Sequence, residues 1–137
     1  MKRPVRSLVV PAGMEAIHAE LGYAPAVRVG SLLLCSGQVG RTADLAVIDD
    51  PETQFRACWS HVERVLAAGG CGFADVVELV TYHVDMPVHY GLFKSVKREV
   101  FPFRDTAWTA IGVASLSRPG LLLEIKATAL VTDPGEA

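Results

Sequence analysis

The chain has 137 residues, which is enough for one domain, and we treat residues 1–137 as a single unit. Half of the residues are hydrophobic and 20% are charged, which excludes intrinsic disorder, since disorder requires low hydrophobicity and high net charge. A domain of this size buries only about two-thirds of its unfolded surface. Part of the apolar material is therefore predicted to lie outside the monomer core, where other copies of the chain would cover it.

Charge and cysteine content exclude further classes. The net charge is −2 and no basic run exceeds two residues, so we expect no nucleic-acid binding. No apolar run reaches the roughly 18 residues of a membrane span, and the first apolar run is too short for a signal peptide. The three cysteines, Cys35, Cys58 and Cys71, have no close pair. They are typical of buried thiols in a reducing compartment, so we expect a cytoplasmic protein with no membrane association.

The first half of the chain predicts three strands and a helix. Residues 5–10 form a short β-rich run, and residues 26–29 and 32–36 form two more, joined by the turn-forming pair Gly30-Ser31. Residues 41–49 are predicted to be a loop. Asp50-Pro51-Glu52 is a favourable helix start, and an apolar stripe at helical spacing continues to Gly69-Gly70, which ends the helix.

The second half predicts three strands and a second helix. Residues 76–85 are rich in Val, Thr and Tyr, which favours a long strand that ends at Met86-Pro87. A helix over about residues 88–101 follows and stops at Pro102. Residues 106–115 and 121–131 are predicted strands, joined by a turn at residues 118–120.

This element order predicts an α+β fold with one mixed sheet of about six strands and two helices on one face. The last strand shows which face is which. Its alternate residues 121, 123, 125, 127, 129 and 131 are all apolar, whereas Leu122, Glu124, Lys126, Thr128 and Leu130 form a mixed face. The apolar face suits the helices. The mixed face suits a subunit interface or a polar cleft.

Several segments in this order resemble the Rid/YjgF family, formerly called endoribonuclease L-PSP. They are residues 22–23, 26–33, 36–39, 54, 65–71, 75–77, 85–86, 109–114 and 123–129. The resemblance covers residues 22–131. It implies a chorismate-mutase-like (YjgF-like) fold and a homotrimer with three clefts between subunits. It also implies a small-molecule ligand in each cleft and, in the best-known branch, hydrolysis of reactive imines or enamines to keto acids and ammonia.

The position of the family's carboxylate-binding arginine is occupied here by Trp108. An indole has one donor and no charge, so it cannot form the paired hydrogen bonds of a guanidinium. This departure, with residues 107–113 and 11–13, resembles the YjgH-like branch that lacks the arginine. Other cations are candidates to replace it: Arg104, Lys94 and Arg28.

The resemblance also indicates candidate site residues. Glu124 aligns with the cleft glutamate and is a candidate to position water, with an ion pair to Lys126, Lys94 or an arginine of another subunit as the alternative interpretation. The candidate ligand-binding residues are Tyr23, Ser36, Gly37, Trp108 and Thr109. Four of them also have a structural interpretation: packing for the two aromatic rings, and a tight turn at Ser36 and Gly37.

No histidine or cysteine spacing matches a metal site, and we expect neither a metal nor another cofactor. Three functions remain open. The first is a small-metabolite-binding trimer that hydrolyses an imine-type substrate. The second is a trimer that binds a ligand or a protein without catalysis, and the third, less favoured, is an endoribonuclease or translation inhibitor.

Overall fold

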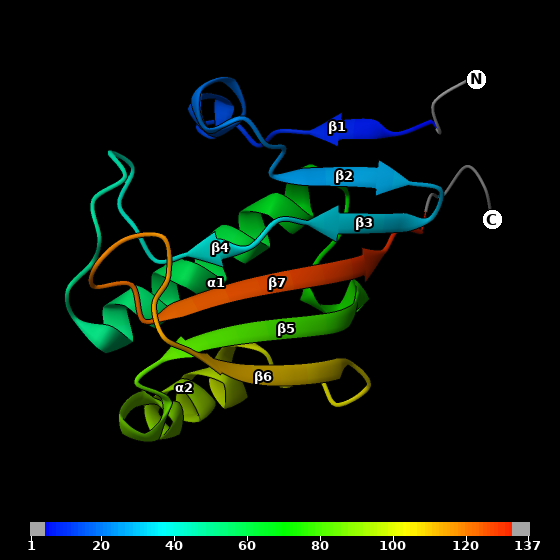
Figure 1. Ribbon diagram of the computed structural model, residues 1–137. Helices are drawn as coiled ribbons and strands as arrows, with labels where there is room; N and C mark the ends of the chain where they lie inside the picture. The colour runs from blue at the N-terminus through cyan, green and yellow to red at the C-terminus, as the bar shows by residue number, and fades with distance from the viewer. Residues whose placement is uncertain (1–4, 133–137) are drawn as a thin grey trace.

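The computed structural model describes residues 5–132 and places them in one mixed β-sheet with two long helices packed on one face (Figure 1). The strand order is β1 (Ser7–Val9), β2 (Ala26–Val29), β3 (Leu32–Cys35), β7 (Leu123–Leu130), β5 (Val76–Val84) and β6 (Ala107–Val113). A seventh strand, β4 (Gln38–Val39), also pairs with β7. Only β5 and β6 are parallel. The α+β fold and the mixed sheet confirm the prediction.

The helices are α1 (Pro51–Ala68) and α2 (Met86–Val100). The Asp50 carboxylate caps α1 by accepting a hydrogen bond of 2.9 Å from the backbone N–H of Thr53, as the sequence predicts. Two short helical segments, Ile17–Leu21 and Phe73–Asp75, were not predicted. Neither they nor the two-residue strand β4 are long enough to produce a hydrophobic period. No helix in the described part of the chain has the length and apolar character of a membrane span.

The alternation of buried and exposed side chains along β7 distinguishes the two faces of the sheet. Leu123, Ile125, Ala127 and Ala129 are fully or almost fully buried under the helices, and Leu121 and Val131 continue that row, as predicted. In Figure 1 α1 passes behind the sheet, so the face toward the viewer carries the other set of side chains, including Glu124. We call this second surface the open face, because no helix of the described chain covers it.

Aromatic rings fill much of the space between the helices and the sheet. Trp59 stacks on Phe93 and Phe101, with ring centroids 6.2 and 5.3 Å apart, and Phe55 meets Phe93 edge-on. Offset and edge-on aromatic pairs add about 0.5–1.5 kcal/mol each beyond the area that they bury. This aromatic layer holds α2 against α1 and β5.

Gln54 of α1 is a fully buried polar side chain whose hydrogen bonds join three segments. Its Nε2 donates to the carbonyls of Ile48 and Gly120, both at 2.9 Å, and its Oε1 accepts from the backbone N–H of Leu122 at 2.7 Å. Gly40 allows this approach, since a Cβ there would lie 2.1 Å from the Gln54 carbonyl oxygen. One amide therefore anchors the loops before α1 and before β7.

We expect the Gln54→Ala substitution to lower the free energy of unfolding by about 3 kcal/mol, because it leaves partly buried backbone groups without partners and creates a cavity. Chemical denaturation at a fixed protein concentration measures the change. Arg56→Ala on the same helix is the control. It removes only exposed ion pairs to Glu52 and Glu99 and should cost less than about 1 kcal/mol. Equal losses in the two variants would contradict the anchoring role of Gln54.

Candidate functional site

Glu124 lies on the open face in the middle of β7, opposite Val39 of β4 and Tyr82 of β5. Its side chain is half-buried. Burial raises the pKa of the Glu124 carboxyl, and the positive charge of Arg41 opposes that rise. A carboxyl group with a raised pKa is suited to exchanging protons with water or a ligand.

Gly37, at the corner between β3 and β4, is in close contact with this carboxylate. A Cβ at position 37 would lie 2.6 Å from Oε2 of Glu124 and 2.7 Å from its carboxyl carbon. Any other residue would therefore displace the Glu124 side chain or the corner itself. The structure thus brings two predicted site residues, Glu124 and Gly37, together.

Ser36 and Tyr23 lie near the same corner. The Ser36 hydroxyl donates a hydrogen bond of 2.6 Å to the carbonyl of Ala24, and its backbone N–H donates to the carbonyl of Pro25 at 2.9 Å. These bonds attach the segment that carries Tyr23 to the end of β3. Tyr23 itself is 37% exposed. Its ring is accessible to a ligand, whereas the Ser36 hydroxyl proton is already donated within the chain.

Trp108 lies on the helix side of the sheet and not on the open face. On β6 it pairs in register with the buried Leu79, and its ring packs against Tyr90 and Phe93 of α2, at centroid distances of 6.4 and 6.1 Å. Thr109, the next residue, points to the opposite side because side chains alternate along a strand. Within one protomer, Thr109 therefore shares the open face with Glu124, and Trp108 does not.

The Trp108 indole begins a short chain of buried hydrogen bonds. Its Nε1–H donates to Oγ1 of Thr81 at 3.0 Å, and Thr81 Oγ1 lies 2.7 Å from Nε2 of His83. Burial lowers the pKa of His83 to about 4, so its ring is neutral at pH 7. A neutral His83 with its proton on Nδ1 accepts the Thr81 hydroxyl proton at Nε2. The three side chains hold the indole in one orientation.

The structure separates the three cations that the sequence analysis considered in place of the arginine that the family resemblance implies. Lys94 and Arg104 line a hollow beside Trp108, whereas Arg28 lies on β2 with its Nε donating to the carbonyl of Gly30. None of the three is the cation that acts on Glu124. That cation is Arg41, from the loop after β4, which the sequence analysis missed.

The sequence analysis also missed Thr81 and His83, for a reason that differs from the case of Arg41. Thr81 and His83 are two residues apart on a strand, a spacing that places them on one face and that sequence reasoning alone can detect. Arg41 has no such pattern, because its electrostatic influence on Glu124 depends on the path of an irregular loop.

Cys35, Cys58 and Cys71 are buried and unpaired, and burial raises the pKa of Cys35 to about 12. Such a thiol remains protonated and is a poor nucleophile. Within residues 5–132, no group of three or more His, Cys, Asp or Glu side chains is arranged to hold a metal ion.

We expect the His83 environment to make stability pH-dependent. As the pH falls from about 6.5 toward 4, the unfolded chain binds a proton at His83 and the folded chain does not. Stability present above pH 6.5 is therefore lost by up to about 1.4 kcal/mol per pH unit in this window. Denaturant unfolding at several pH values measures this loss. The loss should be smaller in His83→Gln and unchanged in the control His18→Gln, and an unchanged loss in His83→Gln would contradict the assignment.

Comparisons with known proteins identify the family of the chain. Residues 13–131 match the family model described as Endoribonuclease L-PSP. The chain is 36% identical to the RutC family protein YjgH of Escherichia coli over 93% of this chain and 97% of that protein. The solved structure of Protein YJGH has a TM-score of 0.85 over 93% of this chain and 98% of that chain.

A second solved structure with similar coverage is Rv2704 from Mycobacterium tuberculosis, a member of the YjgF/YER057c/UK114 family. It is 30% identical, with a TM-score of 0.78 over 93% of this chain and 100% of that chain. These matches cover nearly all of the described fold and confirm the family resemblance of the sequence. The chain therefore belongs to the endoribonuclease L-PSP family, also known as the Rid/YjgF family.

Proposed function

We propose that the protein is a homotrimer that binds a small metabolite on the open face, beside Glu124 and Gly37, in clefts between subunits. The observation that carries this proposal is the half-buried Glu124 carboxyl, whose pKa is raised and which contacts the backbone corner at Gly37. A partly desolvated acid is costly to maintain without a purpose, and such groups concentrate at functional sites.

The reaction that suits this carboxylate best is hydrolysis of an imine or enamine. Glu124 would hold a water molecule and take one of its protons while the water oxygen attacks the imine carbon. The carbon–nitrogen bond then breaks, the nitrogen takes up protons and leaves as ammonia, and a carbonyl compound remains. With Trp108 in place of arginine, the substrate would lack a carboxylate at that position or have an apolar group there.

Apolar side chains on the open face support the trimer. Several large hydrophobic residues of this face are each about 40–50% exposed in the single chain: Val29, Leu32, Leu34, Ile111 and Leu130. Leu32 lies directly opposite Leu130, and Val29 lies opposite Leu32, so these three form a continuous row. A contiguous apolar row of this kind is typical of a surface that another subunit covers.

One observation favours the alternative, a trimer that binds a ligand or a protein partner without catalysis. The Trp108 indole N–H and the Ser36 hydroxyl proton are both donated within the chain. Crystals soaked with small keto acids and aromatic acids would separate the two functions, since a cleft that stays empty with every compound favours the alternative.

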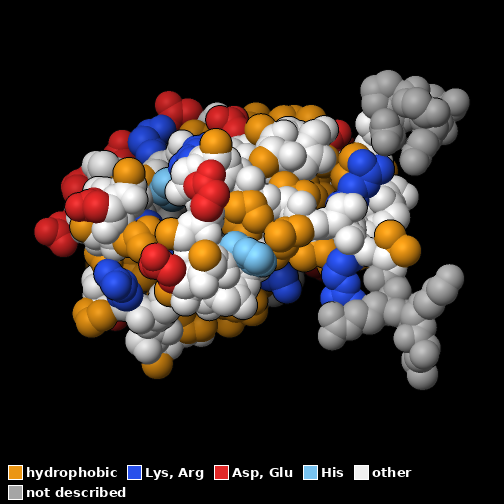
Figure 2. Space-filling view, turned by 90° about the horizontal axis from the view of Figure 1, so that it is seen from above, with side chains coloured by type: hydrophobic (Ala, Val, Ile, Leu, Met, Phe, Trp, Pro, Cys, Tyr) orange, Lys and Arg blue, Asp and Glu red, His pale blue; other side chains and the backbone are white. Residues whose placement is uncertain are grey.

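A role in binding or cleaving RNA has little support. The net charge of the chain is −2, and the one face shown in Figure 2 carries both acidic and basic side chains.

Ammonia release tests the catalytic proposal. We expect the wild-type protein to release ammonia faster from imines without a carboxylate than from freshly generated 2-iminopropanoate or 2-iminobutanoate. Glu124→Gln should lower the rate by about 10²-fold, because the water then has no base. Gly37→Ala should also lower it by displacing the carboxylate.

Glu78→Gln, an exposed carboxylate on β5, is the matched control and should keep the wild-type rate. Full activity of Glu124→Gln would exclude the proposed water-positioning role. Fast turnover of 2-iminopropanoate would instead show that another cation performs the task of the missing arginine.

Solution mass tests the assembly. We expect light scattering to give three times the chain mass of 14.7 kDa, and a charge introduced by Leu130→Lys to dissociate the assembly. Arg56→Lys, on the helix layer, should leave it intact. A clean 14.7 kDa monomer at micromolar concentration would refute the trimer.

A further inference from the structure

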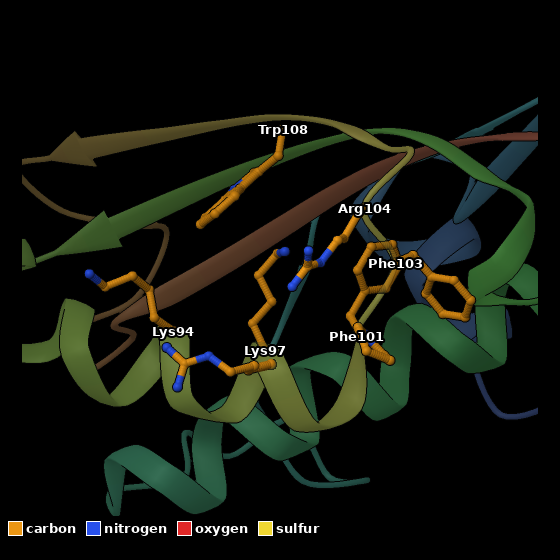
Figure 3. Close-up of a pocket in the computed structure, with 8 residues that line it drawn as sticks. Lys94, Lys97, Phe101, Phe103, Arg104 and Trp108 are labelled. Atoms are coloured by element: carbon orange, nitrogen blue, oxygen red, sulfur yellow. The ribbon is translucent and has the colours of Figure 1, made fainter.

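A hollow lies in the helix layer, between α1, the end of α2 and the short helical segment Phe73–Asp75. It has a volume of about 360 Å³ and is lined by six residues: Arg56, Trp59, Ser60, Glu63, Phe73 and Val100. It shares no lining residue with the cationic hollow beside Trp108, which Figure 3 shows. We propose that this helix-layer hollow binds a small aromatic primary amide, with the indole N–H of Trp59 and the carboxylate of Glu63 as its polar contacts.

Trp59 contributes a buried hydrogen-bond donor without an acceptor. The side chain is 2% exposed, and among residues 5–132 its Nε1 is the only buried side-chain nitrogen or oxygen that has no hydrogen-bond partner. The second tryptophan of the chain differs, since the indole N–H of Trp108 donates to Thr81 at 3.0 Å. A buried donor without an acceptor is unfavourable. Because Trp59 lines the hollow, a ligand carbonyl bound there would supply the acceptor.

The neighbours of Trp59 hold its ring but offer its N–H no oxygen. The indole stacks on Phe93 and Phe101, and Phe73 meets it edge-on at a centroid distance of 5.8 Å. Phenyl rings have no hydrogen-bond acceptor comparable to a carbonyl. The donor is therefore already fixed in place, and a ligand would not have to order it.

Glu63 supplies the second polar contact. It follows Trp59 by four residues on α1, a spacing that makes the two side chains neighbours on one face of the helix. Glu63 is exposed, and its carboxylate forms no ion pair within residues 5–132. The hollow thus presents a free donor and a free acceptor side by side, which is the complement of the carbonyl and N–H of an amide.

The charges around the hollow disfavour an anion. Arg56, the lining cation, already donates to two carboxylates, at 3.1 Å to Glu52 and at 2.6 Å to Glu99. Together with Glu63, these groups leave an excess of negative charge. A carboxylate ligand would be repelled, whereas a neutral amide would not be.

The apolar part of the lining and the volume indicate the body of the ligand. Phe73 and Val100 supply apolar surface beside the polar groups. An apolar cavity of about 150 Å³ accommodates benzene, so about 360 Å³ has room for one ring and an amide group. An aromatic ring can pack edge-on or offset against Phe73.

The hollow is independent of Glu124, because it lies in the helix layer and Glu124 lies on the open face. It would stay accessible in the proposed trimer, whose contacts are on the open face. Binding in the hollow can therefore be tested apart from the proposed function.

Titration with benzamide tests the proposal. In spectra of ¹⁵N-labelled protein, we expect benzamide to move the indole N–H signal of Trp59 to lower field in a saturable way, because a new hydrogen bond deshields the proton. The signal of Trp108, whose N–H is already donated to Thr81, should not move. Acetophenone, which has the carbonyl without the N–H, and benzoate, which has a negative charge in place of the amide, should each bind at least about tenfold more weakly.

Substitutions locate the binding. Trp59→Phe keeps an aromatic ring and removes the donor, so we expect it to weaken benzamide binding at least about tenfold, measured on the backbone N–H signals of Ser60 and Phe73. Glu63→Met removes the acceptor at an exposed position and should weaken binding to a similar extent. It serves as the test should Trp59→Phe fail to fold. Glu20→Met, which removes an exposed carboxylate outside the hollow, is the matched control and should bind as the wild type does.

Several results would overturn the proposal. Equal binding of acetophenone or benzoate would show that the amide is not recognised, and wild-type binding by both Trp59→Phe and Glu63→Met would place the ligand elsewhere. A Trp59 indole signal that stays in place throughout the titration would show that its N–H takes no part. Loss of benzamide binding in Glu124→Gln with retention in Glu63→Met would assign the ligand to the open face. That result would refute this site and leave the proposed function standing.

Discussion

The two-residue period of β7 is the constraint on which the rest of the structure depends. This strand pairs with β3, β4 and β5, so its two faces set the two faces of the whole sheet. Its apolar row must be buried under the helices, which places Glu124 and Leu130 on the open face. A shift of one residue in register would expose the core and bury a carboxylate.

Close approach at glycine brings the site together around this strand. Gly37 allows the corner after β3 to contact the Glu124 carboxylate, and Gly40 allows the same segment to contact α1 at Gln54. Gln54 in turn bonds the loops before α1 and before β7. The position of the Glu124 carboxylate therefore depends on contacts from both faces of the sheet. The environment of the carboxylate is therefore set by several segments of the fold and not by β7 alone.

Trp108 sets the chemistry of the position at which the family resemblance implies an arginine. A guanidinium there would offer paired donors and a charge, whereas the indole offers one donor, already directed at Thr81, and a broad ring face. The ring face now forms one wall of a hollow lined by cations. Four cationic side chains thus lie around an aromatic ring at the position where the family resemblance implies an arginine.

Sequence patterns alone determined the fold class, both long helices and the two faces of β7, because these follow from local patterns of apolar residues and caps. The candidate role of Glu124 came from the family resemblance. The sequence patterns did not separate Trp108 from Thr109, which the sequence analysis assigned together to ligand binding, although the two lie on opposite faces of β6. Only the tertiary structure decided that Trp108 packs against α2, that the charge of Arg41 acts on Glu124, and that Lys97 lies near two aromatic rings. Those contacts lie between segments that are far apart in the chain, and the loops that bring the segments together have no hydrophobic periodicity. Their positions follow from packing and charge in three dimensions, which no short-range pattern encodes.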